Sequence, residues 1–351
     1  MRTIQTTGNP FDRGKQHGAQ CRDLARPWLQ DVLDKFPDNG GNLTAAREQV
    51  NTWLERIEAV RSDLIDECRG IAGGLGMADE EYFAAIFLEH SSWLPMACTI
   101  CGVVDNQGHP VISKTDDIHA HERGMNVLEV TQPDRGYRHV HIHFAGTIWT
   151  TSGMNEKGLG IAMTGIPGAT TDEDGLPSLF VLRTILPECA TVAEVVRHVE
   201  QVPMNAHGFS LAIADRTGQT ELIEATPEGV VTAAPDQRGF RTHTNHILDA
   251  RFAKRNPPQA EPVLTNGRRR LKTATRLLPG LSPDEDGLGE LLQNRDPEGP
   301  ISQEGEDGLF TDYAVILQPC EMRMTLWSGP PSSVEPQRVD IGELLGQIET
   351  T

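Results

Sequence analysis

Two cysteines three residues apart are the first side chains in the sequence that could do chemistry. Cys98 follows Ala97 and precedes Thr99, where the spacing of apolar residues changes from helical to strand-like. A thiol at the start of a strand can be exposed at a sheet end and act as a nucleophile, although a lone cysteine is more often a small buried residue. Cys101 would point to the opposite face of the same strand. Cys98-x-x-Cys101 also matches a redox or metal pair, but the sequence has no second pair to complete a zinc site.

Histidines form a second candidate group. His139, His141 and His143 alternate along one expected strand and share a face, and His119 and His121 do the same nearby. Such His-x-His pairs can present imidazoles to a metal ion, and an exposed polar strand face is the simpler explanation. A metal-dependent hydrolase would also need carboxylate ligands, which the sequence does not identify.

The elements that precede Cys98 are predicted to be helices. Apolar residues recur every three or four positions in residues 10–35, 44–70 and 79–90, so the first 95 or so residues are expected to be mainly helical. The glycine-rich segment 70–76 follows a helix and not a strand, so it does not support a dinucleotide-binding loop.

The elements that follow Cys98 are predicted to be mainly strands. Residues 99–104 and 111–113 flank the turn sequence Asn106-Gln107-Gly108, which indicates a hairpin. Further strands are expected at 126–131, 138–144, 147–152, 159–164, 209–214, 220–225, 313–317 and 322–327, with helical spacing at 178–201. Strands and helices in separate blocks favour an α+β layered fold. The acid-rich segment 282–308 is expected to be a surface loop, with a lid over a site as the alternative.

Composition limits the partners and the compartment. The net charge is -19, from 31 basic and 50 acidic side chains, which argues against nucleic acid or an anionic membrane surface as partner. The chain has no apolar run of about 18 residues and no signal-peptide pattern at its start. Its six cysteines do not form a disulfide framework at this length. We therefore expect reduced thiols and a cytoplasmic protein.

Five segments in order along the chain resemble one family, the acyl-coenzyme A:6-aminopenicillanic acid acyltransferases (isopenicillin N acyltransferases), which are peptidase-C45-like N-terminal-nucleophile (Ntn) hydrolases. The segments are Gly8-Asn9-Pro10 with Gly14 and His17-Gly18, Cys98-Thr99, residues 108–117, residues 153–159, and Thr244-Asn245-His246. The resemblance implies a four-layer αββα sandwich of two antiparallel sheets flanked by helices. It also implies self-cleavage at Ala97–Cys98, giving a helical chain 1–97 and a catalytic chain 98–351 that together form one domain.

The resemblance also implies roles for four residues. Cys98 would be the nucleophile, with its new α-amino group as the base, since an unperturbed α-amine has a pKa of about 7.7–8.0. Asp117 would hold the amine or the thiol, Lys114 would lower the thiol pKa, and Asn245 would donate to the oxyanion. Two segments depart from the pattern. Met163-Thr164-Gly165 lacks a second asparagine, so a second oxyanion donor would come from the backbone or Thr164, and the segment 266–270 gives no clear catalytic arginine.

The resulting hypothesis is an amide hydrolase or acyltransferase that acts on a small amide through a Cys98 acyl-enzyme. An acyl-amino acid, a peptide-like metabolite and an antibiotic-type intermediate all fit this substrate class. No cofactor, metal, nucleic acid or membrane is expected. An acyl-coenzyme A or amine as second substrate, and assembly into a homo-oligomer, stay open. The alternatives are a metal-dependent hydrolase built on the His-x-His pairs and a non-catalytic binding protein with the same fold.

Overall fold

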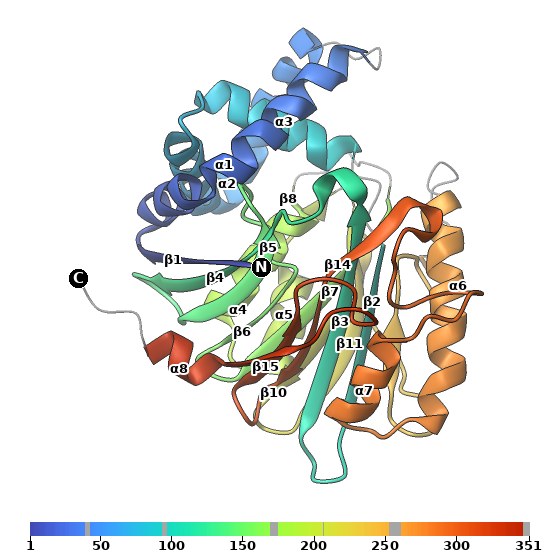
Figure 1. Ribbon diagram of the computed structural model, residues 1–351. Helices are drawn as coiled ribbons and strands as arrows, with labels where there is room; N and C mark the ends of the chain where they lie inside the picture. Colours follow the sequence, from blue (N-terminus) through green and yellow to red (C-terminus); the bar gives the residue numbers. More distant parts are fainter. Residues whose placement is uncertain (39–42, 93–96, 169–174, 206, 253–260, 347–351) are drawn as a thin grey trace.

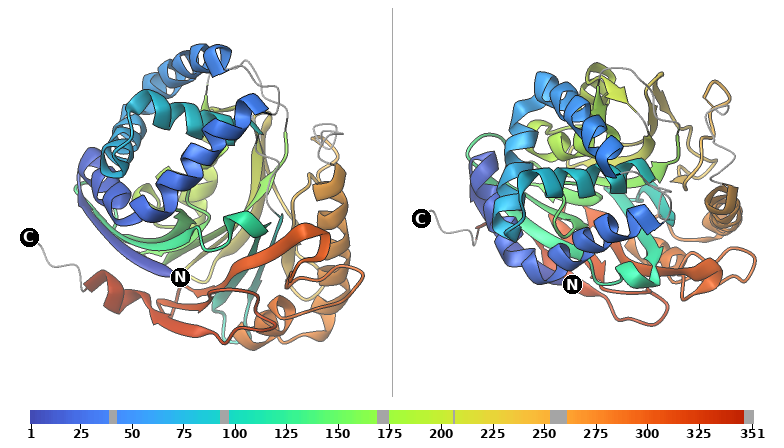
Figure 2. Two further views of the ribbon diagram at one scale, coloured as in Figure 1. Left: turned by 45° about the horizontal axis from the view of Figure 1, so that its top comes forward. Right: turned by 90° about the horizontal axis from the view of Figure 1, so that it is seen from above.

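Two stacked β-sheets with helices on their outer faces form the protein (Figures 1 and 2). The computed structural model describes residues 1–38, 43–92, 97–168, 175–205, 207–252 and 261–346. One sheet has eight strands and the other has six, and all their pairings are antiparallel except the parallel pair β1–β4. This architecture confirms the predicted α+β sandwich.

The larger sheet contains β1 (Arg2–Gly8), β4 (Asn126–Pro133), β5 (His139–Phe144), β6 (Ser152–Asn155), β7 (Leu159–Ile166), β10 (Gly208–Asp215), β11 (Thr220–Thr226) and β12 (Gly229–Thr232), in that order. The smaller sheet contains β13 (Arg241–His243), β2 (Ala97–Val104), β3 (Pro110–His119), β14 (Leu309–Gln318), β15 (Arg323–Trp327) and β16 (Gln337–Asp340). A short ladder joins β8 (Leu176–Pro177) to β9 (Met204–Asn205).

The helices cover both outer faces. Over the larger sheet lie α1 (Pro10–Asp38), α2 (Leu43–Leu75), α3 (Asp79–Ser92), α4 (Ser178–Glu188) and α5 (Val192–Gln201). Over the smaller sheet lie α6 (Glu261–Leu277) and α7 (Glu285–Leu292), drawn in orange in Figure 1, and α8 (Ile341–Gly346) follows β16. No helix in the described ranges is long and apolar enough to cross a membrane.

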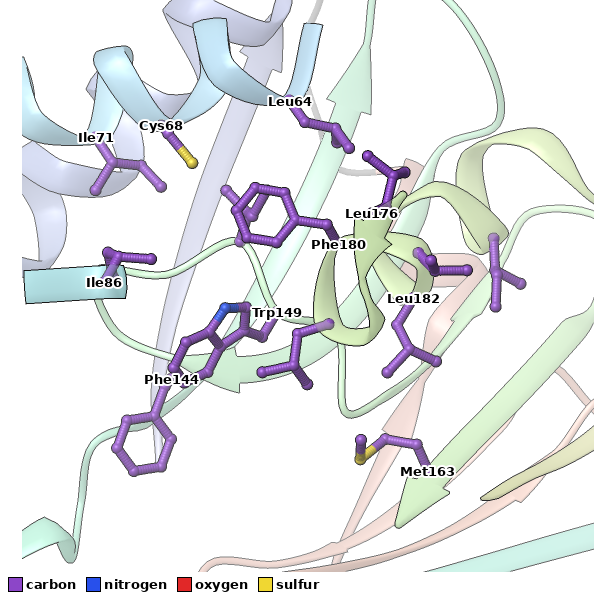
Figure 3. Close-up of a cluster of buried hydrophobic side chains, with 14 of the residues drawn as sticks. Leu64, Cys68, Ile71, Ile86, Phe144, Trp149, Met163, Leu176, Phe180 and Leu182 are labelled. Carbon is purple, nitrogen blue, oxygen red and sulfur yellow. The ribbon is translucent and has the colours of Figure 1, made fainter. Parts of the chain in front are cut away.

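Strand alternation decides which layer each side chain of β2 joins. Ile100 packs between the two sheets, whereas Cys101 and Val103 pack on the outer face under α6 and α7. Because side chains alternate along a strand, Cys98 shares the inner face with Ile100. Figure 3 shows a third apolar layer, where Leu64, Cys68 and Ile71 of α2 face Phe180 of α4.

The three predicted N-terminal helices and the Cys98 hairpin are confirmed, with Gly108 in the turn at φ +88°. Strand β1 was not predicted. The expected strand at 147–152 is wrong except for its last residue, because the hydroxyls of Thr147 and Thr151 occupy the carbonyls of Phe144 and Ile142.

Two other expectations need correction. The helical segment 178–201 is two helices, and Thr191 caps the second of them by accepting a hydrogen bond from the Glu194 amide. The segment 282–308 is not one loop, because α7 occupies residues 285–292 within it. Asp284 caps α7, and Leu288, Leu291 and Leu292 are buried against the smaller sheet.

The glycines of α1 and α2 bring these two helices into backbone contact. A Cβ at Gly70 would collide with the Phe11 carbonyl, one at Gly74 with the Lys15 carbonyl, and one at Gly14 with the Glu67 carbonyl. The glycine-rich end of α2, which does not form a dinucleotide loop, is therefore a helix-packing surface.

We expect Gly70→Ala to lower the free energy of unfolding by about 1–3 kcal/mol, because the two backbones must separate to admit a methyl group. Gly73→Ala is the matched control, since a Cβ there meets nothing within 4 Å. It should raise stability by up to about 1 kcal/mol through helix propensity. Denaturant unfolding of both variants tests the contact, and equal effects at the two positions would contradict it.

Candidate active site

Cys98 lies between the two sheets, at the second residue of β2, and is only 3% exposed. Its thiol lines a small apolar pocket together with Asp116, Phe144, Trp149, Thr151, Met163, Gly165 and Leu179. Figure 3 shows Phe144, Trp149 and Met163 of this lining. The pocket volume is about 10 Å³, which is the space of about one water molecule. The thiol is therefore enclosed by the described residues.

A buried ion pair contacts the thiol. Lys114 Nζ lies 3.6 Å from the Cys98 sulfur and 2.6 Å from Asp116 Oδ1, and Asp116 Oδ1 lies 3.5 Å from the sulfur. Cys98 and Asp116 are direct cross-strand neighbours on β2 and β3, and Lys114 lies two residues from Asp116 on the same face. Lys114, which was predicted to lower the thiol pKa, thus lies beside the thiol.

The electrostatics of the group keep the thiol protonated. Burial raises the pKa of Cys98 to about 12, Lys114 opposes this, and Asp116 adds to it. Burial favours the neutral form of Lys114, but Asp116 and the thiol outweigh it and raise the pKa of Lys114 above its usual value. Lys114 is therefore a cation placed to stabilise a thiolate when one forms.

Asn245 reaches the backbone of Cys98 and not its sulfur. The Cys98 N–H donates to Asn245 Oδ1 at 2.7 Å, and Asn245 Nδ2 donates to the Gly165 carbonyl at 3.0 Å. The loop after β13 is held there because Thr164 Oγ1 donates to the Thr244 carbonyl. In this arrangement Asn245 orients the nitrogen that would become an α-amine, and Thr164 is engaged in positioning the loop.

Arg270 is a site residue that the sequence analysis missed. It is fully buried on α6, and its guanidinium donates to the Cys98 carbonyl, to Thr99 Oγ1 at 2.8 Å and to Asn245 Oδ1 at 2.8 Å. Asn266, one turn earlier, accepts from its Nε at 2.7 Å. Helical periodicity could have found it, because position 270 shares the buried face of α6 with Gly267 and Ala274.

Asp117 faces the layer opposite to the thiol. Its carboxylate accepts from Thr311 Oγ1 at 2.6 Å and from Thr115 Oγ1 at 3.5 Å. Burial raises the pKa of Asp117 to about 7, and Arg270 and Thr311 act against that rise. Strand alternation thus places Asp116 beside the sulfur and Asp117 on the α6 side with Arg270. The sequence signal that could have shown this is strand alternation. Cys98 and Asp116 are paired across the hairpin and lie on the same face, so the next residue, Asp117, lies on the other face.

A β-bulge accompanies this change of neighbours. The pairing of β14 with β3 shifts between Thr311, which faces Asp117, and Tyr313, which faces Asp116. The extra residue, Asp312, accepts from Asn126 Nδ2 at 2.9 Å, and the same nitrogen lies 3.2 Å from Asp116 Oδ2. Asn126 therefore holds the second oxygen of the carboxylate whose first oxygen faces the thiol.

We expect Arg270→Lys to lower the free energy of unfolding by about 2–4 kcal/mol, because one ammonium cannot replace several buried charge-assisted hydrogen bonds. Arg268→Lys on the same helix is the control, since that side chain is 48% exposed in its ion pair with Glu261. It should change stability by less than about 0.5 kcal/mol. Denaturant unfolding curves of both variants test this prediction. Similar losses of stability would show that the buried hydrogen bonds of Arg270 contribute no more than a surface ion pair.

The three histidines of β5 form a buried network and not the exposed polar face considered from the sequence. His139, His141 and His143 are each 1% exposed, and the rings of His141 and His143 stack with centroids 4.5 Å apart. Glu129 Oε2 lies 2.9 Å from both His143 Nε2 and His17 Nδ1. This network attaches α1 to the larger sheet.

Its hydrogen bonds do not favour a metal ion. The ligand atoms of His17, Glu129 and His143 lie within 4.8 Å of one another, as a metal site would require. However, the Gly146 N–H donates to His17 Nε2 at 2.8 Å. Because Nε2 accepts this hydrogen bond, the proton of the ring that faces Glu129 is on Nδ1, and that nitrogen has no lone pair for a metal. The predicted metal-hydrolase alternative gains no support from this geometry.

The Asn155 segment, which carried much of the resemblance, has a structural role. Asn155 Oδ1 accepts from the amides of Lys157 and Leu159, both at 3.1 Å, and so holds the turn between β6 and β7. Its Nδ2 donates to the Leu186 and Cys189 carbonyls at the end of α4, both at 2.7 Å. Gly158 has φ +73°, which glycine adopts without strain.

A mutant conjugated bile acid hydrolase from Clostridium perfringens is similar at 14% identity and a TM-score of 0.44, over 71% of this chain and 94% of that one. Penicillin V acylase from Agrobacterium tumefaciens is similar at 17% identity and 0.44, over 72% and 89%. A Caenorhabditis elegans orthologue of N-acylethanolamine-hydrolyzing acid amidase is similar at 12% and 0.43, over 64% and 93%. Comparison with curated proteins gave no match.

The family model described as acyl-coenzyme A:6-aminopenicillanic acid acyl-transferase matches residues 104–332, about two thirds of the chain. This match starts after Cys98 and includes Lys114, Asp117, Asn245 and Arg270. The chain therefore belongs to the acyl-coenzyme A:6-aminopenicillanic acid acyl-transferase family.

Proposed function

We propose that this protein is a self-processing cysteine amide hydrolase or acyltransferase whose nucleophile is Cys98. The observation that carries the proposal is the double contact of this residue. Asn245 and Arg270 hold its backbone nitrogen and carbonyl, while Lys114 and Asp116 contact its sulfur. A structural cysteine needs neither set of polar partners, whereas an N-terminal nucleophile uses both its amine and its thiol.

Self-cleavage would begin with attack of the Cys98 sulfur on the Ala97 carbonyl carbon. The C–N bond between the two residues breaks, the thiol proton goes to the Cys98 nitrogen, and a thioester forms. Asp116 Oδ1, 3.5 Å from the sulfur, is placed to relay that proton. Water then hydrolyses the thioester and leaves chains 1–97 and 98–351, with a free α-amine on Cys98.

Catalysis on a substrate would use the same groups. The α-amine, oriented by Asn245 Oδ1, takes the thiol proton, and Lys114 stabilises the thiolate that attacks the amide carbonyl. An acyl-enzyme forms as the amine leaves, and water or a second amine removes the acyl group. Phe144, Trp149, Met163 and Leu179 line the pocket at the sulfur, so the lining favours an apolar or aromatic acyl group on a small amide, and the pocket must widen beyond its present volume of about 10 Å³ to admit one. Acyl-amino acids, peptide-like metabolites and antibiotic-type intermediates share this form.

Intact mass of the purified wild-type protein tests the proposal. Two species whose masses correspond to residues 1–97 and 98–351 are expected, and the larger should gain one acyl mass when incubated with a reactive amide or ester of an apolar acid. Time courses with water alone and with added amines then separate hydrolysis from transfer. A protein that stays whole under all conditions and forms no acyl adduct would contradict the proposal.

A further inference from the structure

One asparagine side chain bridges the two sheets beside the thiol. Asn126 begins β4 in the larger sheet, and by strand alternation it shares the inner face with Leu128, which packs between the sheets. Its amide meets two carboxylates of the smaller sheet, Asp116 on β3 and Asp312 on β14. Asp116 is the cross-strand partner of Cys98, so this bridge ends at the candidate nucleophile.

The two carboxylates determine the orientation of the Asn126 amide. Its Nδ2 donates to Asp312 Oδ2 at 2.9 Å and to Asp116 Oδ2 at 3.2 Å, and an amide nitrogen has one hydrogen for each contact. An amide oxygen in this place would face two carboxylate oxygens and be repelled by both. Asn126 Oδ1 is buried without a hydrogen-bond partner in the described structure, so no contact there favours the flipped amide. The nitrogen is therefore directed at Asp116.

Asp312 is fixed by the bulge of β14 and by a turn. In a regular ladder it would pair directly with Asp116, and like charges in direct cross-strand positions are destabilising. Instead it is the extra residue of the bulge. Its Oδ1 accepts from the Gly124 N–H at 2.8 Å, and its Oδ2 accepts from Asn126. Both oxygens of Asp312 are thus bound, and one of them orients the Asn126 amide.

The two oxygens of Asp116 have different partners. Oδ1 lies 2.6 Å from Lys114 Nζ and 3.5 Å from the Cys98 sulfur. Oδ2 accepts from Asn126, which is its one donor among the residues that the structure describes. The side-chain torsion that turns a carboxylate is broad, so contacts at both oxygens restrict it more than contacts at one. Asn126 therefore fixes the plane in which the Asp116 carboxylate meets the thiol.

We propose that Asn126 is a positioning residue for the Cys98 thiol, acting through Asp116 and oriented by Asp312. Its amide fixes the Asp116 carboxylate and partly neutralises the charge that opposes ionisation of the thiol. The role in catalysis rests on the proposed function, since only a nucleophilic Cys98 needs a tuned thiol. The effect on the thiol does not depend on that function, because thiol reactivity can be measured in a chain that is never cut.

Loss of the Asn126 amide should make the thiol harder to ionise. Burial raises the pKa of Cys98 most, Lys114 lowers it, and Asp116 adds to the rise. Without a donor at Oδ2, the Asp116 charge is less neutralised, so its effect on the thiol grows. The thiolate fraction at any pH below the thiol pKa then falls, and alkylation slows because it needs the thiolate.

A double-mutant cycle on the alkylation of Cys98 tests this role. Asn126→Leu keeps the approximate size of the side chain and removes its donor. We expect iodoacetamide at about pH 8 to alkylate Cys98 at least about threefold more slowly in this variant, since a rise of about half a pKa unit lowers the thiolate fraction by that factor. In an Asp116→Asn background the same substitution should change the rate by less than about 1.5-fold, because Asn126 acts through Asp116. Mass spectrometry of the Cys98 peptide, at a matched state of processing, gives the rates.

The outcomes of the cycle are distinct. Equal slowing in the two backgrounds would show that Asn126 contributes only to packing, and unchanged or faster alkylation would show that its amide does not control the thiol. Either result overturns the proposal. A wild-type chain that is never cut or acylated would count against the proposed function alone, because the cycle can still be completed on the uncut chain.

Asp312→Asn provides a second test that leaves the buried Asn126 in place. One amide oxygen cannot accept from both Gly124 and Asn126, so the Asn126 amide loses its orientation and alkylation should slow at least about twofold. Loss of the Asp312 charge alone would speed alkylation, so an unchanged or faster rate would contradict the orientation of Asn126 by Asp312. Asp134→Asn is the matched control, because it removes a 46% exposed charge beyond the other end of β4. It should change the rate by less than about 1.5-fold, since exposed distant charges are screened.

Discussion

Cys98→Ala is expected to remain a single chain of 351 residues and to lose all covalent acylation. The alanine has neither the sulfur that would attack the Ala97 carbonyl nor a group that could carry the acyl intermediate. Loss of a catalytic nucleophile typically costs about 10⁶-fold in turnover, so no activity should be detectable above background. Intact mass and an acyl-adduct assay give both readouts from one sample.

Cys101→Ala is the matched control for this prediction. It removes a thiol three residues away on the same strand, but Cys101 faces the outer layer under α6 and is fully buried there. The variant should still be cut and acylated, although it will lose some stability because a small cavity forms. A Cys98→Ala chain that is cut between residues 97 and 98, or that turns over substrate, would contradict the assignment of Cys98 as the nucleophile.

The helices and most strands could be predicted because their apolar spacing is local. α1, α2 and the β2–β3 hairpin follow from periodicity and from the Gly108 turn. Strand β1 could not be found in this way, because Ile4 is its one apolar residue and its other buried side chain is Thr6. The burial of the β5 histidines could not be found either, because their partners His17 and Glu129 come from α1 and β4.

The candidate site was predictable in part. Cys98, Lys114 and Asn245 do come together, as the resemblance implied. Asp117 was predicted to hold the amine or the thiol, but strand parity places Asp116 beside the sulfur and Asp117 on the α6 side with Thr311. Arg270 was missed among three consecutive arginines, although helical spacing places only this one on the buried face of α6 with Gly267 and Ala274.

Lys114→Met is expected to produce the second large effect, on both thiol reactivity and stability. Lys114 lowers the pKa of Cys98 and Asp116 raises it, against a background in which burial raises it most. Removing the cation therefore raises the thiol pKa further and decreases the thiolate fraction at any pH below it. Each unit of pKa reduces that fraction about tenfold, so alkylation by iodoacetamide between about pH 6 and 9 should slow at least about tenfold.

Asp116→Asn should act in the opposite direction on the thiol, because it removes the charge that opposes ionisation.

Stability measurements distinguish the loss of one charge of the ion pair from the loss of both. Lys114→Met alone leaves the buried Asp116 carboxylate without its partner at 2.6 Å, which typically costs about 3–5 kcal/mol. The double variant Lys114→Met/Asp116→Asn leaves no buried charge there and should recover most of that loss. Denaturant curves and alkylation rates, compared at the same state of processing by intact mass, test both effects. Unchanged pH profiles in the two single variants would show that this ion pair does not control the thiol.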